Sequence, residues 1–187
     1  MDEHAVSLDL MAPAMARGAI GQAESGSYPC AVRWSRMLLA VMLAASVPDF
    51  DPLRFFAGQT HGEARLKVIL RAKKPVSVRG EGMLQPDGSL LLDQIVTEGD
   101  KPPRERHWRL HRIAPGRYAG TLTDARGPVE GIVTGNRMRL RFVSNDGFRI
   151  RQSMTLAPDG RSVANRLVAK RFGIAVAVLT EQITKLD

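Results

Sequence analysis

The sequence is poor in cysteine and in aromatic residues, and it lacks a long hydrophobic run. One cysteine, Cys30, among 187 residues excludes a disulfide framework and a zinc site built mainly from thiolates. No apolar run approaches the ~20 residues that cross a bilayer as a helix, which excludes a multi-span helical membrane protein. The 17 Gly and 11 Pro form no low-complexity tract, which excludes a collagen-like or wholly disordered chain. This length and a hydrophobic content of 44% fit one domain with one core.

Sequence motifs of common catalytic and cofactor chemistry are also missing. The chain has no Gly-x-Ser-x-Gly elbow, no phosphate-binding P-loop and no Gly-x-Gly-x-x-Gly fingerprint. His107 and His111 have the spacing of two metal ligands on one helix face, but their segment alternates as a strand. In a strand the two side chains lie ~13 Å apart, too far to share one ion. We therefore predict no catalytic residue, no metal site and no cofactor.

Residues 1–46 differ from the rest of the chain. They are small and polar up to the basic stretch Arg33-Trp34-Ser35-Arg36, which precedes the apolar run 37–45. Basic residues, a short apolar run and small residues in this order are typical of a secretory signal, here with cleavage before Val47. We expect an exported, periplasmic domain of residues 47–187. If the segment is instead a helix lying on the domain, the expected location is cytoplasmic.

A short helical turn followed by strands is predicted for the remainder. Asp51 suits the N-cap of the turn, Pro52 its first position and Gly58 its exit, and its two Phe side chains would close one end of a barrel. Polar and apolar residues then alternate, most clearly in 137–142. Turn signals separate many of the candidate strands, which are 64–71, 75–84, 89–98, 105–113, 117–123, 128–134, 137–142, 148–156, 162–170 and 173–185.

This succession of strands indicates an all-β fold. Eight to ten short strands in an up-and-down meander, with almost no helix, predict a single antiparallel barrel or a sandwich. A closed barrel is favoured because an open meander leaves two strand edges unpaired.

Short motifs in a fixed order carry a family resemblance. They are Phe56-Ala57-Gly58, Trp108 within Arg106-His107-Trp108-Arg109-Leu110, Tyr118-Ala119-Gly120-Thr121, Gly127 with Gly131, Gly135-Asn136 and Lys170-Arg171-Phe172-Gly173. From Phe55 to Asp187 the chain resembles the DUF3833 family, lipocalin-like bacterial proteins of unassigned function. The resemblance implies a calycin-type barrel and brings no settled catalytic residues. Where that family usually has Asp-Trp-Met, only Met154 is matched here.

The strand alternation predicts a mainly apolar interior with a few polar groups. The residues expected to line a cavity are Gln94, Trp108, Leu110, Met138, Leu140, Phe142, Ile150, Gln152, Met154 and Asn165. Such a lining is typical of a small-ligand pocket, but a small barrel can also be filled by its own side chains.

We favour binding of a small hydrophobic ligand, a fatty acid or another lipid, inside the barrel. A cavity below ~300 Å³ would instead indicate a packed barrel that acts as an interaction protein. An enzyme acting on a lipid-like ligand is a further alternative, with Asp93, His61 or an interior amide assisting. Asp93 is expected to face solvent. A buried ionisable pair in the cavity would favour the enzyme, and a purely apolar cavity would favour a carrier.

The formal net charge is +8, and part of the positive charge lies on one arginine-rich strand face. Arg137, Arg139 and Arg141 alternate with apolar residues on one strand, and Arg149 and Arg151 lie on the next. Such a face is either simply solvated or a site for the phosphates of an anionic membrane or a nucleic acid. Nucleic acid is the least favoured partner, because no aromatic residues for base stacking are interleaved with the arginines.

Overall fold

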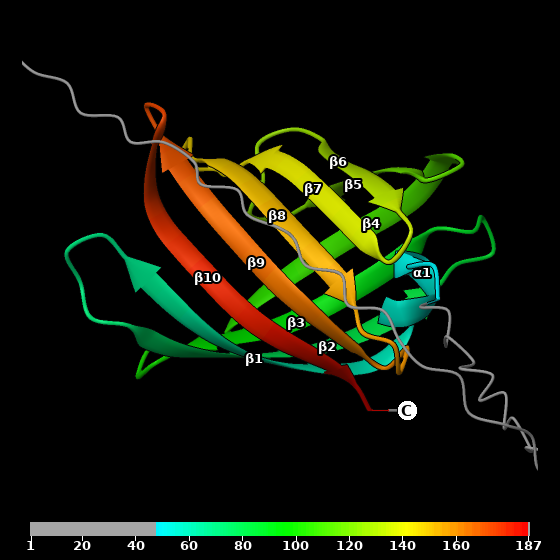
Figure 1. Cartoon of the computed structure of the whole chain (residues 1–187), viewed down its shortest axis with the longest axis horizontal. Helices are drawn as coiled ribbons and strands as arrows, with labels where there is room; N and C mark the ends of the chain where they lie inside the picture. The colour runs from blue at the N-terminus through cyan, green and yellow to red at the C-terminus, as the bar shows by residue number, and fades with distance from the viewer. Residues whose placement is uncertain (1–47, 187) are drawn as a thin grey trace, which may run out of the picture. The chain divides into compact units, whose positions relative to one another are not determined.

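The computed structural model describes residues 48–186 as a closed antiparallel barrel of ten strands with one short helix (Figure 1). Each strand pairs with its neighbours in the chain, and β1 pairs with β10. The elements are α1 (Pro52–Phe56), β1 (Gly58–Val68), β2 (Lys74–Leu84), β3 (Leu90–Glu98), β4 (Arg104–Ala114), β5 (Arg117–Leu122), β6 (Val129–Thr134), β7 (Arg137–Val143), β8 (Arg149–Leu156), β9 (Ser162–Arg171) and β10 (Ile174–Lys185). The predicted all-β up-and-down barrel is confirmed. The predicted leader, 1–46, lies outside the described residues.

The predicted first strand, 64–71, is wrong at both ends, since β1 runs from Gly58 to Val68. Glycines at its start obscure the alternation, so the sequence does not reveal the early beginning. At its other end the chain turns at Leu70, which has a φ of 58° and no adjacent Gly or Pro to signal the turn. Leu70 is therefore almost fully exposed instead of continuing the inward face.

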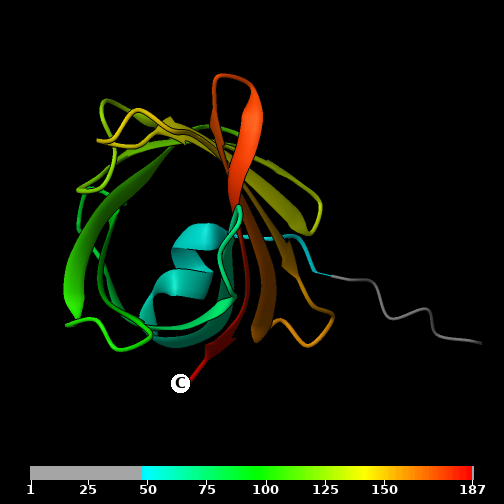
Figure 2. The ribbon, with the colours of Figure 1, turned by 90° about the vertical axis from the view of Figure 1, so that its left-hand side faces the viewer.

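The meander places the turns that follow odd-numbered strands at one end of the barrel and the turns that follow even-numbered strands at the other. Helix α1 precedes the start of β1, so the hairpins β1–β2, β3–β4, β5–β6, β7–β8 and β9–β10 all lie at the other end, called the distal end below. In Figure 2, which looks in from the distal end, α1 is visible at the far end of the barrel. A Cβ at Gly82 would overlap the carbonyl oxygen of Phe56, so glycine is required where α1 approaches β2.

Polar contacts fix α1 at this end. One oxygen of the Asp51 carboxylate accepts hydrogen bonds from the backbone N–H groups of Leu53 at 3.1 Å and Arg54 at 3.4 Å. The other oxygen accepts from the Arg112 guanidinium at 3.0 Å. Lys185, near the end of β10, donates to the carbonyl oxygen of Phe55 at 3.4 Å. The predicted N-cap is confirmed, and the same carboxylate also joins the helix to β4.

The apolar core lies mainly at the α1 end. Phe50, Phe55 and Phe56 are buried and pack edge to face, with ring centroids 5.7 and 5.0 Å apart. They contact inward side chains of the strands, including Leu90 and Met138. A smaller cluster of Ala64, Val76, Val78 and Val96 joins β1, β2 and β3. All strands and both clusters lie within residues 48–186, so a fragment of residues 47–187 contains the complete barrel.

Replacing Asp51 with Ala is expected to lower the free energy of unfolding by about 1–2 kcal/mol, because the helix loses its N-cap. Asp51→Asn keeps a capping oxygen and loses only the charge opposite Arg112, so it should retain most of the stability. Urea unfolding of both variants measures the difference. Equal stability of Asp51→Ala and the wild type would show that the cap does not hold the helix.

Candidate functional site

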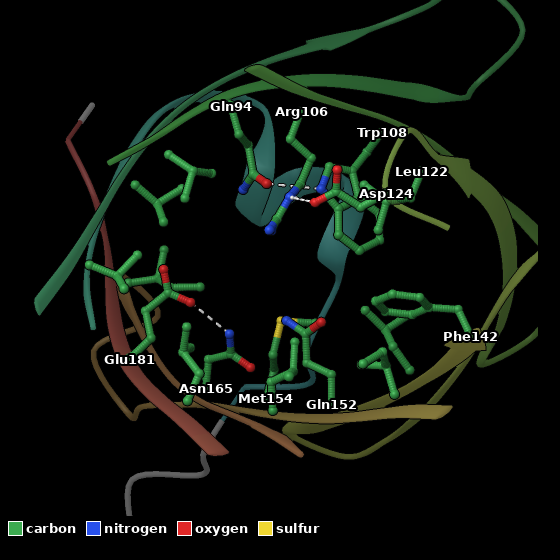
Figure 3. Close-up of a pocket in the computed structure, with 18 of the residues that line it drawn as sticks. Gln94, Arg106, Trp108, Leu122, Asp124, Phe142, Gln152, Met154, Asn165 and Glu181 are labelled. Carbon is green, nitrogen blue, oxygen red and sulfur yellow. Dashed lines mark hydrogen bonds and ion pairs between the residues drawn. The ribbon is translucent and has the colours of Figure 1, made fainter. Parts of the chain in front are cut away.

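The barrel encloses a cavity of about 380 Å³, lined by side chains from α1 and from every strand except β6 (Figure 3). This volume exceeds the ~300 Å³ below which a packed barrel is indicated. All ten residues predicted to face a cavity lie in its lining: Gln94, Trp108, Leu110, Met138, Leu140, Phe142, Ile150, Gln152, Met154 and Asn165. Their contact with a ligand remains a prediction.

Trp108 is held on the cavity wall by two contacts. Its indole N–H donates to the side-chain oxygen of Gln94 at 2.9 Å. Its ring packs edge to face against Phe142, with the centroids 6.1 Å apart. Gln94 and Trp108, both predicted to line the cavity, thus hold each other in place. The tryptophan ring is fixed where a bound molecule would alter its surroundings.

The cavity also contains an ion-pair cluster that was not predicted from the sequence. The Asp124 carboxylate accepts hydrogen bonds from Arg106 at 2.9 Å and from Arg104 at 2.6 Å. Burial alone would raise the pKa of Asp124, but the two arginines outweigh it and lower that pKa. Burial lowers the pKa of Arg106, and the Asp124 charge opposes this effect. One carboxylate therefore faces two guanidinium groups.

A signal for this cluster is present in the sequence. Arg106 lies two residues before Trp108 on β4, which places it on the same inward face. Asp124 lies two residues after Leu122, and Trp108 and Leu122 are partners across the β4–β5 hairpin. Continuing that spacing by two residues on each side, past the end of β5, brings Arg106 to Asp124.

Glu181 and Asn165 form a second polar group on the facing wall (Figure 3). The Asn165 side-chain N–H₂ donates to the Glu181 carboxylate at 2.7 Å. Burial raises the pKa of Glu181, while the Asn165 hydrogen bond and the Arg106 and His61 charges act against that rise. A Cβ at Gly62 would overlap the carboxylate, so this glycine leaves the space that Glu181 occupies.

Asn165 provides an open hydrogen-bonding position in the cavity. The side chain is only 5% exposed, and its Oδ1 atom has no hydrogen-bond partner among the described residues. Its N–H₂ group points toward Glu181, which leaves the oxygen as the free atom. A buried acceptor of this kind costs free energy until a donor reaches it, so the site suits a molecule that supplies an O–H or N–H group.

The sequence does not reveal Glu181 as an interior residue. The stretch Ile174-Ala-Val-Ala-Val-Leu-Thr180 is apolar on both faces, so its alternation cannot say which face is inward. The structure decides it through pairing with β1, where Ala64 is opposite Glu181.

The ionisable residues considered earlier lie outside the cavity. Asp93 faces solvent as expected and accepts a 2.7 Å hydrogen bond from His107 Nδ1, which raises the pKa of His107. Both belong to a hollow of about 490 Å³ on the outer face of β1 to β4. His61 is 3.7 Å from Glu63 and does not line the cavity. His111 is exposed, and no group of three or more metal-ligating side chains occurs in residues 48–186.

The five predicted surface arginines, Arg137, Arg139, Arg141, Arg149 and Arg151, are all exposed on β7 and β8. Arg141 and Arg151 are direct partners across the two strands. Like charges in that position repel each other, and Glu130 at 3.9 Å from Arg141 is a distant counter-ion. The outer face of these strands therefore favours nearby anions.

A closed antiparallel meander around an internal cavity defines a calycin-type, lipocalin-like barrel. The chain belongs to DUF3833, a family of proteins of unknown function whose family model matches residues 35–185. The predicted family membership is confirmed. No curated protein matches the chain.

Solved structures with the same fold share little sequence with this chain. The S-type phycobiliprotein lyase CpeS from Guillardia theta is 6% identical with a TM-score of 0.55, over 72% of this chain and 90% of that one. A DUF3598 protein of unknown function from Nostoc punctiforme is 14% identical with a TM-score of 0.57, over 79% of this chain and 53% of its own. Rv2717c from M. tuberculosis is 14% identical with a TM-score of 0.55, over 74% of this chain and 100% of that one.

No helix within residues 48–186 combines the length and the apolar character needed to cross a membrane.

Glu181→Gln is expected to stabilise the barrel progressively as pH rises above 4.5, the ordinary pKa of this carboxyl. The folded pKa is raised, so the unfolded chain ionises first and the wild type loses stability relative to Gln until the folded pKa is passed. Urea unfolding at several pH values measures the difference. Glu130→Gln, at an exposed outer position, is the control, and parallel curves for wild type and Glu181→Gln would contradict the prediction.

Proposed function

We propose that this barrel binds a small amphipathic ligand of the fatty-acyl type in its cavity. The observation that carries the proposal is a mainly apolar cavity of about 380 Å³ in which a buried Asn165 oxygen has no partner among the described residues. The volume is at the lower end of the ~300–1,000 Å³ range for small-molecule sites. The apolar side chains suit a hydrocarbon tail, because covering them removes apolar surface from water.

The polar side chains supply a position for the head of such a ligand. Arg106 lies on one wall of the cavity, and Gln152 and Asn165 lie on the facing wall (Figure 3). Arg106 shares its carboxylate partner with Arg104, so its guanidinium can also donate to a ligand oxygen. The Asn165 Oδ1 atom accepts from a hydroxyl or a protonated carboxyl. A head group that carries both an acceptor and a donor can accept from Arg106 and donate to the Asn165 oxygen.

Native mass spectrometry of residues 47–187 as purified, followed by organic extraction, tests the proposal. We expect a discrete added mass that extracts as a lipid-like molecule. Added decanoic acid should also shift the fluorescence of Trp108, the sole tryptophan of this fragment. A mass equal to the bare chain, together with an unchanged spectrum at saturating decanoic acid, would contradict the proposal.

Ala177→Phe is expected to reduce the affinity for decanoic acid at least tenfold, because Ala177 lines the cavity and the larger side chain takes ligand space. Ala164→Phe is the matched control, since Ala164 is exposed on β9 and lies outside the lining. Titration of the Trp108 fluorescence measures both variants. Similar loss in both, or in neither, would show that the ligand does not occupy this cavity.

An enzyme acting on a ligand in the same cavity is the second candidate. It is favoured by the ionisable groups that the cavity holds, since the lining is not purely apolar. Glu181, whose pKa is raised by burial, is suited to give or take a proton. Extraction of a ligand that has been chemically altered by the wild type but not by Glu181→Gln would support this candidate over a carrier.

Export and attraction to anionic surfaces complete the proposal. The export signal is expected within residues 1–46, and detection of a chain beginning at Val47 in the periplasm tests it. The outer arginines of β7 and β8 favour long-range attraction to an anionic membrane, because their charges face solvent without close counter-ions among residues 48–186.

A further inference from the structure

Two neighbouring hairpins at the distal end carry exposed apolar tips. Leu70 in the β1–β2 turn is 97% exposed, and Phe172 in the β9–β10 turn is 92% exposed. Ile69 and Ile174 beside them are 52% and 63% exposed. The hairpins adjoin because β1 pairs with β10, and the Ile69 N–H donates to the carbonyl oxygen of Val176 at 2.9 Å. In Figure 1 both project from the end opposite α1.

The backbone at these two tips is unfavourable for the residues that occupy it. Leu70 and Phe172 have φ values of 58° and 51°, and they are the only non-glycine residues with positive φ in the part of the chain that the structure describes. Phe172 and Gly173 form a two-residue turn with both φ positive, in which Asn-Gly is the preferred sequence. Large apolar residues at strained, exposed positions do not serve the fold, which points to a function at the tips.

Basic side chains surround the apolar tips. Segments 67–75 and 170–176 contain six Lys or Arg and no Asp or Glu: Lys67, Arg71, Lys73, Lys74, Lys170 and Arg171. Asp100 and Asp146 belong to other distal turns. The Arg171 guanidinium lies 5.6 Å from the Phe172 ring and 5.4 Å from the ring of Phe148, which lines the cavity. The patch therefore combines apolar tips, one sign of charge and contact with the distal wall of the cavity.

We propose that the β1–β2 and β9–β10 hairpins dock this barrel on an anionic lipid bilayer, with Leu70 and Phe172 inserted among the lipids. Lys and Arg of the two hairpins contact the phosphates, and each basic residue near the surface contributes to attraction. The apolar tips leave water on insertion, and this burial contributes binding free energy that salt does not screen. The distal end of the barrel then faces the membrane. This docking does not depend on the ligand proposed above.

Binding of residues 47–187 to sedimented vesicles tests the proposal. We expect binding to vesicles of phosphatidylglycerol and phosphatidylcholine, and little to phosphatidylcholine alone. The double substitution Leu70→Asn/Phe172→Asn should weaken binding at least roughly tenfold, from the apolar area withheld from the lipid. Phe172→Asn should at the same time raise the melting temperature, since Asn suits the turn. A rise in stability with a loss of binding cannot come from misfolding.

Matched variants separate the tips from other surfaces. Met83→Asn/Ile113→Asn removes two exposed apolar residues at the α1 end and should change binding less than twofold. Arg139→Glu/Arg141→Glu alters the outer arginine face and should weaken vesicle binding mainly at low salt. The fragment has no cysteine, so Phe172→Cys or Ile113→Cys carries one environment-sensitive dye. Only the dye at 172 should shift to the blue with anionic vesicles.

Several results would overturn the proposal. They are absence of binding to the anionic vesicles, equal binding by the tip variant and the wild type, and equal dye shifts at positions 172 and 113. Loss of binding at all salt concentrations in the arginine variant alone would place the membrane contact on β7 and β8 instead.

Discussion

The pairing of β1 with β10 is the constraint on which the rest of the structure depends. It runs from Thr60 opposite Lys185 to Val68 opposite Ala177 and joins the two ends of the meander. An open meander would expose two unpaired edges and bring no second wall to the cavity. The same pairing brings Glu181 into the interior, sets Lys185 beside α1 and places two hairpins from distant parts of the chain next to each other.

Polar groups inside a barrel cost stability unless they are paired, and this barrel pairs most of those it contains. Asp124 is satisfied by two arginines and Trp108 by Gln94. Glu181 accepts from Asn165. Among the buried side-chain atoms of residues 48–186, the exception is the Asn165 oxygen. A void left only by imperfect packing is apolar, whereas several polar side chains of this lining bond to one another, and the Asn165 oxygen is open to a donor from a ligand.

The sequence was sufficient for the fold and for much of the cavity lining, because alternation with period two reports which face is inward. It predicted the cap at Asp51 and the inward placement of Trp108, Leu140 and Asn165. It did not reveal Glu181, since β10 is apolar on both faces and only its pairing with β1 decides the inward one. It also misplaced Leu70, because a left-handed turn at a leucine carries no local signal. Both features depend on long-range strand pairing or on backbone strain, and neither of these can be read from local sequence patterns.

Because α1 closes one end of the barrel, the Phe56 ring is the floor of the cavity. The closed end limits how far a flexible ligand chain can enter the cavity. Longer molecules must then fold back or protrude, and shorter ones leave apolar wall uncovered. If the cavity holds the proposed ligand, the depth open to its chain is set by the hydrogen bonds of Asp51 and Lys185 to a helix of only five residues. Selection by chain length would follow from how firmly that helix is held.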